Sequence, residues 1–241
     1  MLDLTVVMPA YNEGDGIGGF LREIVAGFGP AIEVVVVNDA STDDTSAVVT
    51  GLGLPQVRLI EAPANRGHGP TTRQALEAGL AGRRELVLAV DGDGQFEVAE
   101  MVRLVEVFRA LQVDVAEGVR RERNDPLFRR LTSIGTRLLV GLRCGQLPAD
   151  ANTPLRLYRH GVLADLIAGL PADAMTPNLL ISALTRCRGL RVLEFPVSAR
   201  DRRGTGVVGS SWRQHRRWLP SWSFIRFCAR AVRQWTTTRL R

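Results

Sequence analysis

The chain has 241 residues, of which 45% are hydrophobic and 23% charged, as in an ordinary globular protein with one large domain or one domain and an appendage. Its net charge of +6 comes from the carboxyl-terminal tail, because ten arginines and no acid follow Asp201, whereas the first 201 residues carry −4. No apolar stretch approaches the eighteen or so residues that span a bilayer, and the opening MLDLTVVMPAYNE is unlike a signal peptide.

Three apolar runs rich in β-branched residues predict buried parallel strands at residues 4–8, 32–37 and 86–90. Apolar residues with helical spacing lie between them, at 17–25 and 71–80. Strands that alternate with helices predict a doubly wound α/β sheet, in which ligands bind outside the carboxyl ends of the strands. Those ends are polar and acidic here, and they read PAYNE, NDASTDDT and DGDGQ.

The stretch DGDGQ, residues 91–95, is open to two interpretations. Asp-Gly between apolar residues is typical of a tight hairpin turn, with the aspartates chosen for local geometry. A hairpin needs a second strand, but apolar residues recur at intervals of three and four from Val98 to Leu111, which predicts a helix. We therefore expect the two aspartates in a strand-to-helix loop at the ligand-binding edge of the sheet.

Glycines 14, 16 and 19 spell G-x-G-x-x-G between a strand and a helix, with Glu33 at roughly the distance of a ribose-binding acid. In a dinucleotide fold the first glycine turns directly off the strand, whereas PAYNE intervenes here. We therefore expect these glycines inside the opening of the helix.

The remaining elements are less regular. Strands are expected near residues 113–119 and 155–158, and helices at 127–142 and 162–187. The composition shifts near residue 200, which divides the chain into a domain at 1–200 and a basic, tryptophan-rich tail at 201–241. Cys144, Cys187 and Cys228 lie far apart without a C-x-x-C pair, so we expect neither a disulfide nor a zinc site, and a reducing, cytoplasmic setting.

Seven segments resemble, in order, the glycosyltransferase family 2 pattern, and within it the dolichol-phosphate and other polyprenyl-phosphate sugar transferases. They are VVMPAYNEGDGI, VVVVNDASTDDT, NRGHGPTTRQALEAG, LVLAVDGDGQF, EGVRRERN, RRLTS and DANTPLRLYRH. The resemblance implies the GT-A fold, a mostly parallel doubly wound sheet flanked by helices, here with a carboxyl-terminal amphipathic helical tail. It also implies inverting, metal-dependent transfer of a mannose- or glucose-type sugar from a GDP- or UDP-sugar to a polyprenyl phosphate.

The resemblance further implies that Pro9, Tyr11, Glu13 and Asp39 line the nucleotide pocket. Acids at strand ends can accept hydrogen bonds from the base and the ribose, and Tyr11 offers a flat face. The alternative is that Glu13 and Asp39 are helix caps, as we expect for residues 41–44.

Asp91 and Asp93 match the family's metal-binding D-x-D, and Gln95 lies where the polyprenyl-phosphate transferases have a further ligand. Carboxylates are the hard oxygen donors that Mg²⁺ or Mn²⁺ requires while it bridges two phosphates. The metal would neutralise the charge that develops on the departing nucleoside diphosphate.

Arg120, Arg129 and Ser133 match positions that hold the lipid phosphate in the polyprenyl-phosphate transferases. Arg129 and Ser133 are four residues apart, and so share a face if the segment is helical. A guanidinium suits a phosphate because it donates two hydrogen bonds at once. The alternative is a solvated basic helix face, which we expect for Arg121, Arg123 and Arg130.

The segment DANTPLRLYR resembles D-x-x-x-G-F-R-L-x-R of the family, with Asp150 and Arg156 in register and departures at Pro154 and Leu155. A hydroxyl acceptor would need a general base, for which Asp150 is the candidate. A phosphate acceptor is already anionic and needs none. A hydroxyl on a soluble molecule or glycan therefore remains the alternative acceptor.

The tail contains Arg203, in a loose match to the family's mobile loop, as a candidate for closing over the phosphates. From Trp222 to Trp235 an apolar face lies opposite arginines, which is typical of a helix that lies on an anionic membrane surface. We therefore expect a peripheral protein on the cytoplasmic face of the membrane. Packing of this helix on the domain or in a dimer is the alternative.

A third hypothesis, from another class, is a nucleic-acid-binding module that uses the arginines and tryptophans of the tail. It leaves the acidic strand ends unexplained, and a domain with a charge of −4 would repel a polyanion. We therefore expect no nucleic-acid partner.

Overall fold

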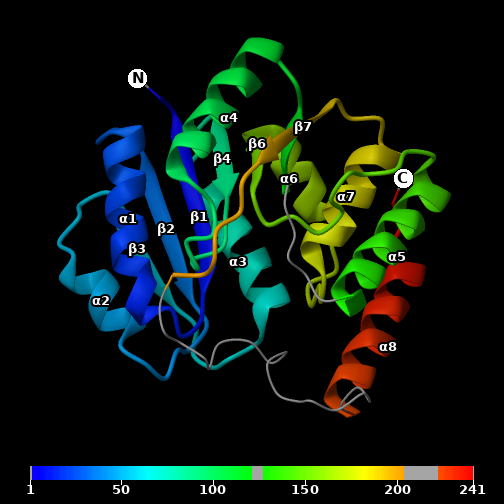
Figure 1. Ribbon diagram of the computed structural model, residues 1–241, viewed down its shortest axis with the longest axis horizontal. Helices are drawn as coiled ribbons and strands as arrows, with labels where there is room; N and C mark the ends of the chain where they lie inside the picture. Colours follow the sequence, from blue (N-terminus) through cyan, green and yellow to red (C-terminus); the bar gives the residue numbers. More distant parts are fainter. Residues whose placement is uncertain (1, 121–126, 204–221, 241) are drawn as a thin grey trace.

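The computed structural model describes residues 2–120, 127–203 and 222–240, and within them it contains a seven-stranded sheet between two layers of helices (Figure 1). The strand order is β3-β2-β1-β4-β6-β5-β7, and β6 is antiparallel to both of its neighbours while the other pairs are parallel. The strands are β1 (Leu4–Ala10), β2 (Glu33–Asn38), β3 (Val57–Glu61), β4 (Leu86–Ala89), β5 (Val115–Arg120), β6 (Arg156–Arg159) and β7 (Val192–Val197).

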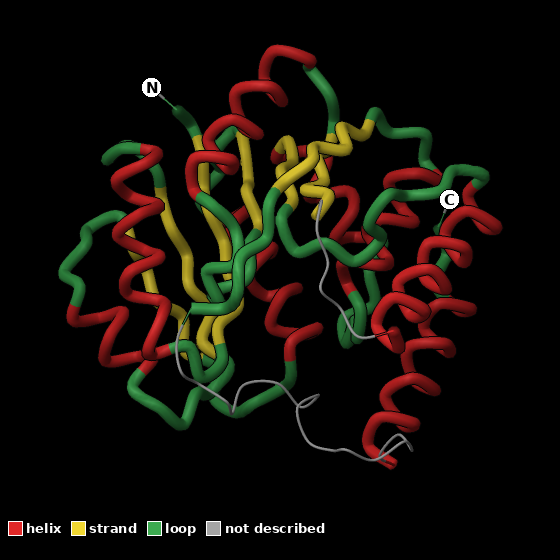
Figure 2. Tube along the Cα trace, in the orientation of Figure 1, coloured by secondary structure: helices red, strands yellow, loops and turns green. Residues whose placement is uncertain are grey.

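The helices cover both faces of the sheet (Figure 2). They are α1 (Gly14–Phe28), α2 (Thr45–Gly51), α3 (His68–Ala81), α4 (Val98–Leu111), α5 (Leu127–Cys144), α6 (His160–Ala168), α7 (Pro177–Cys187) and α8 (Trp222–Thr237). Alternate residues of β1 enter two separate cores, with Val6 packed under α1 and α4 and Val7 packed under α3. Burial on both faces explains why β1, β2 and β4 are continuous apolar runs.

The predicted α/β architecture is confirmed, with a mostly parallel sheet and helices on both of its faces. The segment after DGDGQ is helix α4, and the G-x-G-x-x-G glycines lie in the opening of α1, so the hairpin and dinucleotide interpretations are both excluded. The continuous helix expected at 162–187 is wrong: α6 ends before Gly169, and Pro177 begins α7.

Two strands were not predicted, and both are at edges of the sheet. β3 and β7 pair on one side only, and most of their residues are partly or fully exposed. An edge strand lacks the unbroken apolar run by which a buried strand is recognised in a sequence. This exposure explains why no hydrophobic run marks them in the sequence.

The expectation that no disulfide forms is wrong. Cys144, at the end of α5, is bonded to Cys187, at the end of α7, across 43 residues of sequence. Sequence spacing does not reveal that two helix ends meet in space. The expected reducing setting rested partly on the cysteine pattern and loses that support, since disulfides are uncommon in reducing compartments. Among the described residues, no helix is long and apolar enough to cross a bilayer.

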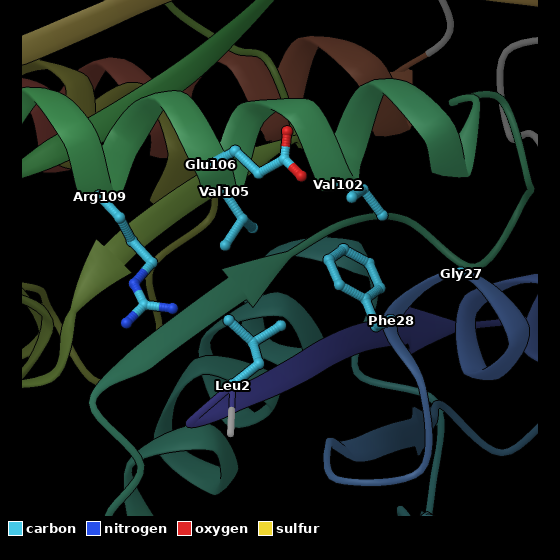
Figure 3. A pocket seen from close by; sticks show the side chains of 7 residues that line it. All are labelled: Leu2, Gly27, Phe28, Val102, Val105, Glu106 and Arg109. Carbon is cyan, nitrogen blue, oxygen red and sulfur yellow. The ribbon is translucent and has the colours of Figure 1, made fainter.

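A cavity of about 480 Å³ lies at the amino-terminal end of β1, between α1 and α4 (Figure 3). Leu2, Phe28 and Val105 approach one another across it, and Glu106 and Arg109 stand beside it. It therefore lies at the opposite end of the sheet from the acidic strand ends, where an open α/β sheet binds its ligands.

A buried ionic network ties β5 to β6 and α7. The carboxylate of Glu117 is fully buried, and it accepts a 2.7 Å hydrogen bond from the guanidinium group of Arg156 and another from that of Arg186. Arg186 also donates to Glu194 of β7 at 2.9 Å. Because every charge in this network has an opposite charge beside it, removing one member leaves the others buried and uncompensated.

We expect Glu117→Gln to lower the free energy of unfolding by about 3 kcal/mol, since the buried Arg156 loses its counter-charge and Arg186 keeps only the partly exposed Glu194. Glu85→Gln is the matched control, because Glu85 is half exposed and pairs with Arg159 at 3.5 Å on the surface. The control should cost less than about 1 kcal/mol. Urea unfolding measures both, and equal losses would show that burial of the network does not determine its contribution.

Candidate functional site

The loops that follow β1 and β4 are held together by backbone contacts. The Gly92 N–H donates to the carbonyl of Pro9 at 3.2 Å, which joins the end of PAYNE's strand to the start of DGDGQ. A Cβ atom at residue 92 would lie only 3.1 Å from that oxygen, so this close approach favours glycine. As a result, the acids of both loops face one space at the edge of the sheet.

The loop after β2 joins the same site. The Asp39 N–H donates to the Ala10 carbonyl at 2.9 Å, and the Asn12 N–H donates to Ser41 at 2.9 Å. Asp43 accepts hydrogen bonds from the N–H groups of Gly14 and Thr45, both at 3.0 Å. Asp43 therefore caps the starts of α1 and α2, as expected for this segment.

Asp39, predicted to face the nucleotide, is 2% exposed and holds the next loop in place. Its two carboxylate oxygens accept the N–H groups of Arg66, at 2.9 Å, and Gly67, at 2.8 Å. Gly67 adopts φ +86° and leads directly into α3. The carboxylate thus orders the entrance of α3, which is close to the capping alternative considered for it.

Asp91 and Asp93 differ in exposure although they share one loop. The Asp91 side chain is 26% exposed, whereas that of Asp93 is 6% exposed and accepts the Gln95 N–H at 3.2 Å. Gln95 directs its side-chain amide to the carbonyl of Arg200, at 3.4 Å. This bond uses the amide nitrogen of Gln95, whereas a metal would bind the amide oxygen, so Gln95 stays a predicted ligand beside the two carboxylates.

Glu13 completes a cluster of acids with these aspartates. Its side chain makes no capping hydrogen bond to α1, so the capping alternative fails for this residue. Burial, opposed by Arg202 and reinforced by Asp93 and Asp91, raises the pKa of Glu13 to about 7. Burial and the charge of Asp91, opposed by Arg202, raise the pKa of Asp93 to about 6. The cluster therefore holds more negative charge than its surroundings stabilise, and it favours a cation.

A cation of the chain itself already lies there. The Arg202 guanidinium donates to Glu13, and its Nε atom lies 3.3 Å from Asp93 Oδ2. Arg203, the residue predicted to close over the phosphates, turns the other way and pairs with Glu23 of α1 through two 2.6 Å hydrogen bonds. Sequence could not distinguish these two arginines, because adjacent side chains in an extended segment point in opposite directions.

Arg202 is held in place by a segment that we call the strap, residues 199–203, which follows β7. Residue 199 forms an isolated bridge with Phe96, and the Arg200 N–H donates to the Gln95 carbonyl at 2.9 Å. The Arg203 N–H donates to the Asp93 carbonyl at 3.0 Å. The strap therefore lies along the second half of the DGDGQ loop, from Asp93 to Phe96.

His68, at the start of α3, also reaches the acids, and sequence reasoning did not select it. Its Nε2 atom is 3.9 Å from Asp91 Oδ1, and its side chain is 60% exposed. The residue stands in NRGHGP, one of the segments of the family resemblance. Since a lone histidine carries little signal, only the folding of α3 against β1 shows that it adjoins Asp91.

The predicted acceptor residues are separated into different environments. Arg120, at the end of β5, donates to one oxygen of Asp150 through Nε and Nη2, at 3.0 and 2.9 Å. Arg156 is fully buried in the network with Glu117, so it holds the fold and does not face a substrate. Ser133 lies on α5, and the side chain of Arg129 lies outside the described residues.

The acid cluster fits a divalent metal held jointly with a substrate. Among the residues that the structure describes, no group of three His, Cys, Asp or Glu side chains is arranged to hold a metal alone. Asp91 and Asp93 can supply two hard oxygen ligands, and phosphate oxygens would supply others. The guanidinium of Arg202 between Glu13 and Asp93 shows that these carboxylates take up positive charge.

We expect Asp93→Asn to stabilise the metal-free protein. Because the pKa of Asp93 is raised from 3.8 to about 6, its ionisation costs stability progressively as the pH rises through that interval. At about pH 8 the variant should gain on the order of 2 kcal/mol, and the gain should vanish near pH 4. Urea unfolding in chelator measures this difference. Asp165→Asn, at an exposed position, is the control, and a variant less stable than the native protein at the higher pH would contradict the account.

Comparison with known proteins shows what this chain is similar to. An undecaprenyl-phosphate 4-deoxy-4-formamido-L-arabinose transferase from Sodalis glossinidius is 29% identical to this chain, and the alignment covers 83% of this chain and 60% of the relative. A dolichyl-phosphate beta-glucosyltransferase from Trichomonas vaginalis is 30% identical, with 80% and 62% covered. The chain thus spans about 60% of the length of these relatives.

Among solved structures, a mannosyltransferase from Pyrobaculum calidifontis in complex with GDP-Man and Mn²⁺ aligns with a TM-score of 0.62 at 21% identity. The alignment covers 97% of this chain and 62% of that one, and it confirms the GT-A fold. Residues 5–166 match the family described as Glycosyl transferase family 2, and this range includes all three acidic strand ends. The chain belongs to glycosyl transferase family 2.

Proposed function

We propose that this chain transfers a sugar from a GDP- or UDP-sugar to a polyprenyl phosphate, with inversion at the anomeric carbon and with Mg²⁺ or Mn²⁺ as cofactor. The observation that carries the proposal is the cluster of Glu13, Asp91 and Asp93 at the carboxyl ends of parallel strands, already paired with a cation of the chain. Carboxylates and phosphates are both anionic, so a nucleoside diphosphate would bind at such a site together with a divalent metal, which the acids would contact in place of the phosphates.

On the donor side, Asp91 and Asp93 would hold the metal, which stabilises the negative charge that develops on the leaving diphosphate. Glu13, the half-buried Tyr11 and Pro9 would line the nucleotide pocket at the carboxyl end of β1. Asp39 contributes by ordering the loop into α3, through its bonds to the backbone of Arg66 and Gly67. These residues orient the donor, so that the bond between the sugar and the diphosphate faces the acceptor.

On the acceptor side, the state of Asp150 favours a phosphate over a hydroxyl. One oxygen of Asp150 accepts two hydrogen bonds from Arg120, and the other accepts the Asn152 N–H at 3.2 Å. A carboxylate engaged in this way is poorly placed to remove a proton from a hydroxyl. A phosphate needs no base: its oxygen attacks the anomeric carbon, the bond to the nucleoside diphosphate breaks, and a single displacement inverts the centre. The names of the two relatives support the same acceptor class.

Arg120, with Arg129 and Ser133 of α5, forms the proposed phosphate-binding set. Strand β5 ends at Arg120 and helix α5 begins at Leu127, so the two elements flank residues 121–126 in the sequence. Its present partner, Asp150, is a counter-charge that a phosphate would replace. In this arrangement Arg120 binds the acceptor and Arg156 remains in the buried network.

The test is transfer of a labelled sugar from GDP- and UDP-sugars in the presence of Mn²⁺ and a polyprenyl phosphate. We expect labelled product in the organic phase, with its anomeric configuration inverted by NMR. Asp91→Asn should lower the rate by on the order of a hundredfold or more with the fold unchanged, whereas Asp165→Asn should not.

Near-normal activity of Asp91→Asn would remove the D-x-D from the mechanism. A parallel reaction with a lipid-free extract tests the alternative acceptor. Labelled product confined to that reaction would assign a hydroxyl acceptor and overturn the proposed one.

A further inference from the structure

From Ser133 to Leu142, helix α5 (Leu127–Cys144) has its polarity reversed relative to an ordinary surface helix. Its inner side carries Ser133, Thr136 and Arg137 beside the fully buried Val140. A helix on a globular protein normally places its apolar stripe inward and its polar residues toward water. Here large apolar side chains recur every four residues on the outer side, and they are Ile134, Leu138 and Leu142, with 49%, 51% and 87% of their surfaces exposed.

Two further leucines extend this surface. Leu139 is 44% exposed, and Leu147, just beyond the helix, is 54% exposed and packs over Gly141, where a Cβ atom would lie 2.9 Å from its Cδ1 atom. We call Ile134, Leu138, Leu139, Leu142 and Leu147 the α5 ridge. Of the seven large hydrophobic residues found exposed in the described part of the chain, five belong to it. A contiguous apolar patch of this kind marks an interaction surface.

The helix that carries the ridge and the helix beside it contain basic residues only, although Arg230 of α8 pairs with Asp173 at 3.8 Å. Helices α5 and α8 together contain seven arginines and no acid. They stand side by side (Figure 1), joined where Arg143 donates to the carbonyls of Trp235 and, at 2.7 Å, Thr238. Arg226, Arg230 and Arg233 of α8 are exposed. An apolar ridge beside exposed arginines complements a surface that is apolar inside and anionic outside, as a bilayer with acidic lipids is.

The apolar face of α8 is engaged with the domain at its carboxyl-terminal end, although Val232 on this face is 60% exposed. The partly buried Trp235 packs against the hydrophobic core. The Gln234 side chain donates to the Asp173 carbonyl and accepts the Met175 N–H, both at 2.8 Å. The carboxyl-terminal half of α8 is thus docked on the domain, as in the alternative considered for it. Trp222 and Ile225 lie where the structure describes no side chains.

We propose that the α5 ridge docks this protein onto the surface of an anionic lipid bilayer. The inference deepens the proposed function, on which it rests for the nature of the acceptor. With the ridge in the bilayer, the opposite side of α5, which carries Ser133, faces the domain. A lipid phosphate could then meet the enzyme at the inner side of the helix while its chain stays in the membrane.

The test is flotation of the full chain with vesicles of phosphatidylcholine and phosphatidylglycerol, without donor or acceptor. We expect Leu138→Glu/Leu142→Glu to reduce the floated fraction by about tenfold or more, because both charges would enter the apolar layer. Leu111→Glu is the matched control, since Leu111 is 55% exposed on α4 and outside the ridge. It should float like the native protein, and thermal unfolding should show both variants folded.

Equal flotation of the native protein and the double variant would overturn the proposal. Sedimentation equilibrium without lipid tests the competing occupant, a second copy of the chain. A native dimer that the double variant dissociates would assign the ridge to a protein interface and would also overturn it.

Failure of the proposed function remains distinguishable. Flotation requires no sugar transfer. If the protein binds vesicles through the ridge but transfers no sugar to polyprenyl phosphates, only the proposed activity is contradicted. If both hold, the double variant should retain turnover of a short, water-soluble polyprenyl phosphate and lose turnover of the acceptor embedded in vesicles.

Discussion

The burial of Glu13 and Asp93 next to Asp91, together with the repulsion among these three acids, is the constraint on which the site depends. Parallel strands bring their carboxyl ends to one edge of the sheet, and Gly92 lets the loops after β1 and β4 touch. The three acids therefore lie in one space, where ionisation of Glu13 and Asp93 is unfavourable. The cost appears as raised pKa values for Glu13 and Asp93, and Arg202 offsets part of it. A site that is unfavourable when empty of cations is prepared for a metal and a diphosphate, which is a common compromise between stability and function.

Sequence predicted the parts of the fold that obey one local rule. Strands β1, β2 and β4 are buried on both faces and are recognisable as apolar runs. Helix α4 is recognisable because its apolar residues recur at intervals of three and four. The edge strands β3 and β7 and the Cys144–Cys187 bond were not predicted, because each depends on what lies beside the segment in space. The break between α6 and α7, in contrast, has local signals in Gly169 and Pro177, and the prediction of one continuous helix overlooked them.

The site divides in the same way. The D-x-D could be placed at the strand end from sequence, because its loop joins a recognisable strand to a recognisable helix. That Arg202 and not Arg203 reaches the acids, that His68 adjoins Asp91, and that Arg156 is buried in an ionic network all depend on side-chain direction. The outward leucines of α5 were likewise invisible, since periodicity shows that a helix is amphipathic but not which side faces the protein.

Calorimetric titration of GDP and of UDP, each with Mn²⁺ and with chelator, tests the central claim most directly. If the acids hold a metal with the substrate's diphosphate, one nucleotide should bind the native protein at least about tenfold more tightly with Mn²⁺, and Asp91→Asn should lose that increment. Equal affinities with Mn²⁺ and with chelator, or an increment that survives in Asp91→Asn, would contradict the account.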